Sequence, residues 1–178
     1  YRAFMQSMPF FGIIAISATF VVTLGEIDLS FPSIVGITSL TFGLILTATD
    51  GNFFIAFALA SALGMFAGLI NGLLVTKIGI PSIVATIGTL YFWRGLVNVI
   101  SQGSGVAIVD VADGTWHHTL FVEKLFGLIP AQFIWFIVLT ALMQWVYRYH
   151  KFGNHIHFVG DNKDSSQMMG INVDNIKI

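Results

Sequence analysis

Two carboxylates stand close together in a chain that is otherwise strongly apolar. Glu26 and Asp28 lie in the segment Gly25-Glu26-Ile27-Asp28-Leu29-Ser30, between apolar runs at about 8–24 and 31–49. Paired carboxylates can act as general acid and base, but residues two apart do not face each other on a helix. Because an ionised carboxylate is costly in hydrocarbon, this block must lie at an interface, in a water-filled cavity or inside a helix bundle. Glu26 and Asp28 are therefore candidates for a translocation pathway or a structural polar cluster.

The histidines do not complete a metal site. His117-His118 and His155-x-His157 have no third ligand at a recognisable spacing. Cysteine is absent from the sequence, so thiolate ligands, cysteine nucleophiles and disulfides are absent as well. Neither a nucleophile–base arrangement nor a glycine-rich phosphate loop is found. We expect the chain to be no enzyme by itself and to carry no cofactor and no metal.

The composition is that of a membrane protein. The chain is 56% hydrophobic and 10% charged, whereas soluble domains carry roughly 25% charged residues. The apolar runs are continuous and do not alternate with polar residues, which favours helices over barrel strands. The net charge of −1 and the lack of a basic patch argue against nucleic acid as a partner. The sequence predicts an all-α, polytopic helical membrane protein in contact with lipid.

Five segments have about the length that a helix needs to cross a bilayer, roughly 20 apolar residues. They lie at about 8–24, 31–49, 53–75, 81–100 and 128–146, and the first of them is short. Pro32, Pro81 and Pro130 stand near helix starts, where the missing N–H costs nothing. The residues Thr49-Asp50-Gly51-Asn52 are typical of a tight turn, so the second and third helices should be antiparallel neighbours.

Basic residues predict the orientation of the chain. Lys77 follows the third segment, and Arg148 and Lys151 follow the fifth, so both places should be cytoplasmic. The loop 101–127 is then external, and Arg2 would also be external, against the rule. A further helix before Tyr1 would restore a cytoplasmic N-terminus, which suggests a fragment of a longer protein. We expect transmembrane helices in residues 1–149 and a cytoplasmic segment in residues 150–178 that leads to the next helix.

The third segment carries small residues at a spacing of four. Small residues let two helix backbones approach closely in lipid. We expect this ridge to pack against another helix of the chain, the alternative being a seam between two copies. Its members are Ala56, Ala60, Gly64, Gly68 and Gly72.

Two polar residues within the apolar segments are further candidates for the pathway or for structural contacts. Asn71 lies beside the small-residue ridge and needs a polar partner if it is buried. Arg94 lies near the external end of the fourth segment, where it can extend outward, pair with a carboxylate or contact a solute. The hydroxyls of Thr86 and Thr89 are expected to bond to the preceding turn of their own helix.

The segment 161–170 reads as a short cytoplasmic helix. Asp161 is an N-cap candidate, with Asp164 three residues on as in a capping box, and Gly170 is a natural C-terminal stop. Met168 and Met169 form an adaptable apolar end. Such a helix suggests docking to a partner, and a solvated loop is the alternative.

Four motifs in this order and spacing resemble one family. They are Gly25–Ser30, then Ile80–Leu90, then Arg94-Gly95, and finally Val159-Gly160-Asp161-Asn162 with Gly170-Ile171-Asn172-Val173. The chain resembles the permease subunits of ribose-, xylose- and galactose-type ABC importers, which include autoinducer-2 and nucleoside relatives. One departure is Glu26, which stands where the family pattern has glycine, so we expect Asp28 to be the more sensitive of the two acids.

The resemblance implies a subunit of about ten helices in the cell (inner) membrane, of which this chain would hold the second to the sixth. It implies that residues 161–170 form the coupling helix of the cytoplasmic ABC ATPase, with Asp161, Asp164, Met168, Met169 and Gly170 as coupling residues. It also implies a second permease subunit, identical or related, and a solute-binding protein outside. The expected function is import of a simple sugar, and the alternatives are a nucleoside or autoinducer-2 importer, or an ATP-independent channel or carrier.

Overall fold

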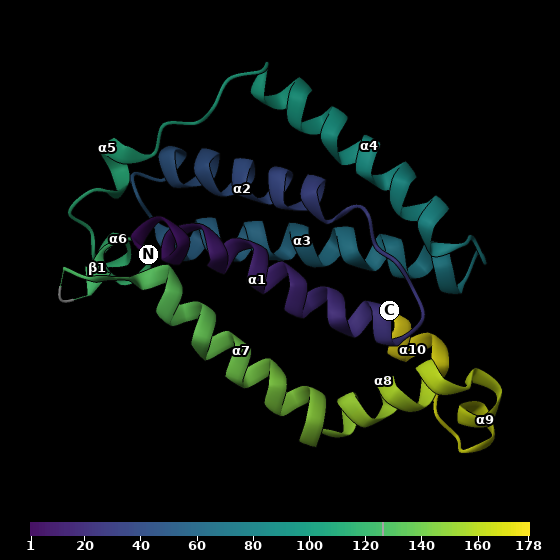
Figure 1. Ribbon diagram of the computed structural model, residues 1–178. Helices are drawn as coiled ribbons and strands as arrows, with labels where there is room; N and C mark the ends of the chain where they lie inside the picture. The colour runs from purple at the N-terminus through teal and green to yellow at the C-terminus, as the bar shows by residue number, and fades with distance from the viewer. Residues whose placement is uncertain (126) are drawn as a thin grey trace. The chain divides into compact units, whose positions relative to one another are not determined.

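The structure is a computed structural model that describes residues 1–125 and 127–178, and its long elements are all helices (Figure 1). Contacts divide the chain into two compact units. One unit joins Tyr1–Ile27 with Gly114–Lys177, and the other consists of Asp28–Asp113 with Ile178. The all-α fold predicted from the continuous apolar runs is confirmed.

The unit Asp28–Asp113 is a three-helix group. Its long helices are α2 (Phe31–Ala48), α3 (Phe53–Thr76) and α4 (Ser82–Ser101), followed by the single turn α5 (Val109–Ala112). Helix α2 packs against both α3 and α4 (Figure 1). The contacts are made by two apolar clusters, Ile37 with Ala67 and Trp93, and Leu46 with Ala56 and Ala112.

The turn between α2 and α3 follows the residue types. Asp50 and Gly51 adopt positive φ angles of 50° and 86°, which reverse the chain in four residues. The Asn52 side chain caps α3 by accepting a 3.3 Å hydrogen bond from the Ile55 N–H. The antiparallel neighbours expected from this turn are confirmed.

The other unit is built around α1 (Arg2–Thr23) and α7 (Ala131–Tyr149), which run in the same direction. Gly12 lies against the ring of Phe136, and near the C-terminal ends the hydroxyls of Thr23 and Tyr147 are 2.9 Å apart. The absence of a side chain at Gly12 lets the aromatic ring approach the α1 backbone.

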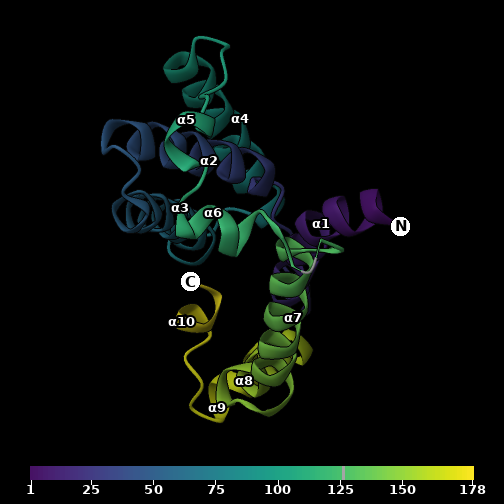
Figure 2. The same ribbon diagram turned by 90° about the vertical axis from the view of Figure 1, so that its left-hand side faces the viewer.

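Short elements complete this unit. Helix α6 (Trp116–Phe121) and the two-residue antiparallel strands β1 (Lys124–Leu125) and β2 (Ile129–Pro130) precede α7. Helices α8 (Lys151–Asp161), α9 (Lys163–Met168) and α10 (Val173–Lys177) gather at the other end of α7 (Figure 2). A cluster of Leu24, Ile156, Val159 and Val173 holds α8 and α10 to the end of α1.

Among the described residues, four helices are long and apolar enough to cross a membrane: Ala3–Thr23, Phe31–Ala48, Phe53–Thr76 and Ser82–Ser101. The expectation of a short first span is wrong, because α1 continues through the polar Ser7, whose hydroxyl donates to the Ala3 carbonyl at 3.0 Å. The fifth expected segment forms α7 three residues later than expected, after Pro130. Its Gln132, Gln144 and Arg148 make it more polar than the other four.

The direction of α7 agrees with a fifth crossing. Three spans, α2 to α4, separate α1 from α7, so a chain that crosses at each helix must run in the same direction through both. The structure shows this parallel arrangement of α1 and α7. It is the arrangement required when Lys77, Arg148 and Lys151 share one side of the membrane.

Candidate functional site

A hydrogen-bonded chain joins the block around Asp28 to two membrane helices. Asp28 Oδ1 accepts from the Ser30 N–H at 2.7 Å and from the Ser30 hydroxyl at 2.6 Å. The Asn71 amide donates to Ser30 Oγ at 2.8 Å, and the Thr89 hydroxyl donates to Asn71 Oδ1 at 2.8 Å. The four residues, which we call the polar chain, connect the start of α2 to α3 and α4.

Three of the four residues of the polar chain are closed to solvent, and Asp28 is half-buried. Ser30, Asn71 and Thr89 are buried, with Ser30 fully inaccessible. Each side chain in it has a partner, so the carboxylate of Asp28 is balanced by two donors. Interhelical hydrogen bonds in a bilayer contribute about 0.6 to 1.7 kcal/mol each. The arrangement fixes three helices at one level and offers no nucleophile or proton relay to a bound substrate.

Glu26 belongs to a separate ionic cluster at the end of α1. Its carboxylate Oε1 pairs with Lys177 Nζ from α10 and lies 3.7 Å from Lys163 Nζ of α9. The Lys177 side chain is only 7% exposed, while that of Lys163 is 54% exposed. Burial lowers the pKa of Lys177, and its hydrogen bond to Glu26 opposes that shift. Glu26 and Asp28 therefore have different partners although they are two residues apart.

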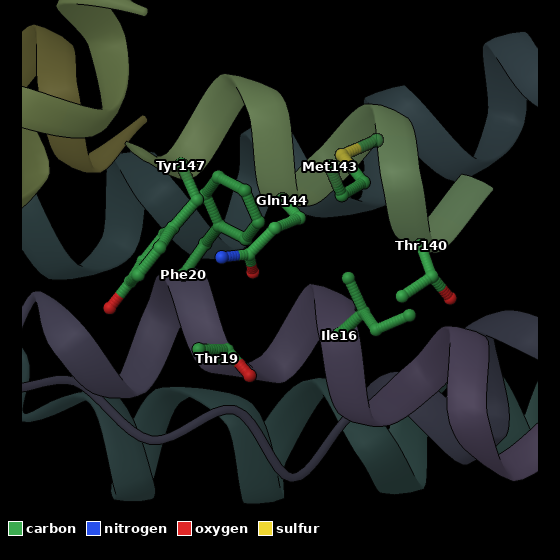
Figure 3. A pocket seen from close by; sticks show the side chains of 7 residues that line it. All are labelled: Ile16, Thr19, Phe20, Thr140, Met143, Gln144 and Tyr147. Atoms are coloured by element: carbon green, nitrogen blue, oxygen red, sulfur yellow. The ribbon is translucent and has the colours of Figure 1, made fainter. Parts of the chain in front are cut away.

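A small cavity lies between α1 and α7 (Figure 3). Its volume is about 110 Å³, and Thr19 and Phe20 face Thr140, Gln144 and Tyr147 across it. Pockets for drug-sized ligands measure about 300–1,000 Å³. The Thr19 and Thr140 hydroxyls donate to carbonyls of their own helices at 2.9 and 2.6 Å. This cavity is smaller than a pocket for a drug-sized ligand.

Arg94 is not part of either cluster. It is exposed on α4, whereas its neighbour Trp93 is buried against α2 and α3. The structure thus brings Asn71 to Asp28 through Ser30 but does not bring Arg94 to them. Thr89 was expected to bond to the preceding turn of its own helix, and its hydroxyl lies 3.3 Å from the Thr86 carbonyl. The same hydroxyl also reaches Asn71 Oδ1 at 2.8 Å, a contact that the sequence did not predict.

The small-residue ridge is only partly a contact surface. Ala56 and Ala60 are buried, and a Cβ at Gly64 would lie 3.3 Å from Thr38 Cγ2 of α2. A Cβ at Gly68 would meet no atom within 4 Å, so Gly68 makes no close contact with another helix in the part of the chain that the structure describes. With 3.6 residues per turn, a spacing of four advances about 40° around the helix at each step. The ridge therefore winds away from α2, and the buried face of α3 continues through Ala67 and Asn71 instead.

The last of the ridge residues, Gly72, lies beside the final residue of the chain. A Cβ at Gly72 would lie 3.0 Å from Ile178 Cα. Gly72 therefore contacts the backbone of Ile178 and does not pack against one of the long helices at this point.

The segment 161–170 is helical, but its N-cap differs from the expected one. Asp161 is the last residue of α8, and Asn162 caps α9 by accepting from the Ser165 N–H at 3.0 Å. Asp164 lies in the first turn of α9. Gly170 ends the segment with a φ of 80°, as expected of a C-terminal stop.

The methionines of this segment point away from the chain. Met168 is 87% exposed and Met169 is 59% exposed. Ser166, on the other side of α9, is buried, and its hydroxyl donates to the carbonyl of the N-cap residue Asn162 at 2.8 Å. An apolar end that remains exposed outside the spans is a surface that a partner can cover.

The two histidines of α6 contact residues close to them in the sequence. His117 Nε2 lies 3.0 Å from Thr115 Oγ1, and His118 Nδ1 lies 3.6 Å from Glu123 Oε1. Within residues 1–125 and 127–178, no three His, Cys, Asp or Glu side chains are grouped as metal ligands would be.

Comparison with known proteins decides the family. A family model described as "Branched-chain amino acid transport system / permease component" matches residues 2–178. The chain belongs to this permease family. The resemblance found from the four motifs is confirmed at this level, and with its apolar helices the chain is a multi-pass protein of the inner membrane.

Curated relatives are similar over nearly the whole chain. The autoinducer 2 import system permease protein LsrC of Yersinia pseudotuberculosis serotype O:3 (strain YPIII) is 35% identical over 167 residues, which cover 93% of this chain and 46% of the relative. The LsrC protein of Yersinia pestis (strain Pestoides F) is 34% identical over 166 residues, with the same coverage. The chain therefore spans about half the length of these relatives. No solved structure matches.

Proposed function

We propose that this chain is part of the transmembrane permease subunit of an ATP-binding-cassette importer for a simple sugar or a sugar-like solute. Hydrolysis would take place on separate cytoplasmic ATPase subunits, and an external binding protein would deliver the solute to a pair of permease subunits. The observation that carries the proposal is α9, a six-residue helix beyond the spans that presents Met168 and Met169 to solvent. A channel or carrier that does not use ATP has no need of such a helix.

The solute itself is a second question. The relatives named as autoinducer 2 import permeases favour autoinducer-2 over a nucleoside. In this proposal the permease and the external binding protein divide the tasks of transport and recognition. Selectivity would then depend on the binding protein. Titrating that protein with labelled ribose, a nucleoside and autoinducer-2 distinguishes these three solutes.

The test of ATPase docking is the double variant Met168→Asp with Met169→Asp in the full-length permease. Burying one such side chain in a partner groove contributes roughly 1.5–3 kcal/mol. Loss of both should reduce copurification of the ATPase more than tenfold and abolish transport, while the membrane helices remain folded.

The matched control adds the same charges to the same helix without removing a methionine. Ser165→Asp with Gln167→Asp changes two exposed polar residues and should leave most of the copurified ATPase in place. If the methionine double variant copurifies its ATPase and transports at the parental rate, α9 is not the docking element and the importer proposal loses its support.

A further inference from the structure

Glu26 touches both short helices that follow α8. Lys163 is the first residue of α9 and Lys177 is the last residue of α10, and both amino groups converge on Glu26 Oε1. The pair with Lys177, whose side chain is only 7% exposed, is held more firmly than a surface pair and fixes Glu26 against α10. The pair with Lys163 joins Glu26 to α9.

Two further contacts make the region around Glu26 rigid. A Cβ at Gly160 would overlap the Thr23 carbonyl oxygen, so the end of α8 lies directly on the end of α1. Leu24 packs with Ile156 and Val159 just before Glu26. Movement of α9 relative to the end of α1 must therefore change the Glu26 contacts.

Glu26 is also two residues away from the start of the polar chain. From Asp28 the hydrogen bonds of the polar chain continue without a break into α2, α3 and α4, through Ser30, Asn71 and Thr89. The linker Gly25–Ser30 thus has an ionic contact with α9 at one end and a hydrogen-bonded contact with α3 at the other.

We infer that Glu26 is a positioning residue that transmits movement of α9 to the linker Gly25–Ser30, and through Asp28 to α2, α3 and α4. This inference rests on the proposed docking of an ATPase to α9. The ATPase would displace α9 as it binds nucleotide, and Lys163 would carry Glu26 with it. A merely structural Glu26 would stabilise the fold without making the linker respond to nucleotide.

The experiment measures the linker directly and needs no known solute. Because the chain has no cysteine, Leu29→Cys, at an exposed linker position, reports the state of the linker through its rate of reaction with a thiol reagent. The rate is measured in the permease–ATPase complex with ATP and vanadate and without nucleotide. We expect the two rates to differ at least about fivefold, the lower end of the usual coupling between two sites. In the background Glu26→Gln the two rates should become equal, with copurified ATPase unchanged.

Three variants separate this role from others. Glu123→Gln removes an exposed carboxylate elsewhere and should keep the nucleotide response. Glu26→Lys should abolish the response, and Glu26→Lys with Lys163→Glu should restore it, because opposite charges again join α9 to the linker. The inference is overturned if the Glu26→Gln complex keeps the nucleotide response, or if the parental linker shows none. Loss of ATPase from the parental complex would instead contradict the proposed function.

Discussion

The Asn71 side chain lies between Ser30 and Thr89, donating to the first and accepting from the second at 2.8 Å each. A primary amide has both a donor and an acceptor end, so one residue of α3 binds the start of α2 and the middle of α4. Neither hydroxyl can do this alone, because Ser30 already donates to Asp28. The polar chain is therefore directional. The Ser30 hydroxyl donates to Asp28, and the Thr89 hydroxyl lies closer to Asn71 Oδ1, at 2.8 Å, than to the Thr86 carbonyl, at 3.3 Å.

Replacing Asn71 should loosen the contact among three helices. Asn71→Leu keeps the branched side-chain skeleton but removes two interhelical hydrogen bonds, so we expect a loss of about 1–3 kcal/mol. Unfolding in mixed micelles with increasing SDS measures the change. Thr47→Val is the control, since the Thr47 hydroxyl donates to the Gly43 carbonyl of its own helix. Equal stability of Asn71→Leu and Thr47→Val would contradict the proposed importance of the polar chain.

The small-residue ridge should respond differently at two of its positions. Gly64→Leu forces a side chain toward Thr38 and should reduce the yield of folded permease several-fold. Gly68→Leu enters open space and should be mild within this chain. Size-exclusion chromatography of the detergent-extracted protein compares the two. If Gly68→Leu is the more damaging, a helix outside residues 1–178 covers that part of α3.

Gly160 should tolerate no side chain. Gly160→Ala places a Cβ against the Thr23 backbone oxygen, which cannot rotate away, and such overpacking costs about 1–3 kcal/mol. The thermal midpoint of the permease should fall. The same substitution at Gly88, within α4, meets no neighbouring atom and should be neutral or slightly stabilising, because alanine favours a helix. If the Gly160→Ala permease had the same thermal midpoint as the parental protein, α8 would not pack directly on α1.

Labelling of single cysteines checks the orientation. Ser104→Cys in the loop after α4 should react with an impermeant thiol reagent in intact cells, and Ser165→Cys in α9 should react only after lysis. Both positions are exposed, so accessibility within the protein does not limit either reaction. The reverse pattern would place α9 outside the cell and exclude its docking to an ATPase.

Local signals in the sequence predicted much of the fold. The apolar runs gave the long helices, and Asp50-Gly51 gave the reversal between α2 and α3. The predicted N-cap of α9 was wrong by one residue, because Asp161 and Asn162 are adjacent and both residue types suit an N-cap. The choice depends on how far α8 continues, which its apolar residues Ile156 and Val159 decide by packing against Leu24.

The candidate site could be predicted only in part. The composition around Asn71 showed that a buried amide would need a partner, but the partners lie 41 and 18 residues away. Lys177 is separated from Glu26 by 151 residues. A pairing over such distances leaves no trace in one sequence, because any of several lysines satisfies the same charge requirement. Likewise, a strict spacing of four suggested a straight ridge where the helix period makes it wind.

The parallel packing of α1 on α7 has a consequence for biosynthesis. Roughly 100 residues separate the two helices, so at about 5–20 residues per second α1 waits on the order of 10 s before its neighbour is made. During that interval the face that will meet α7, including Gly12 and Thr23, is open to lipid or to an insertion factor. Helices α2, α3 and α4 can already assemble with one another in that time. The order of packing thus differs from the order of synthesis, because α1 is made before α2, α3 and α4 but meets its neighbour α7 after they can have assembled.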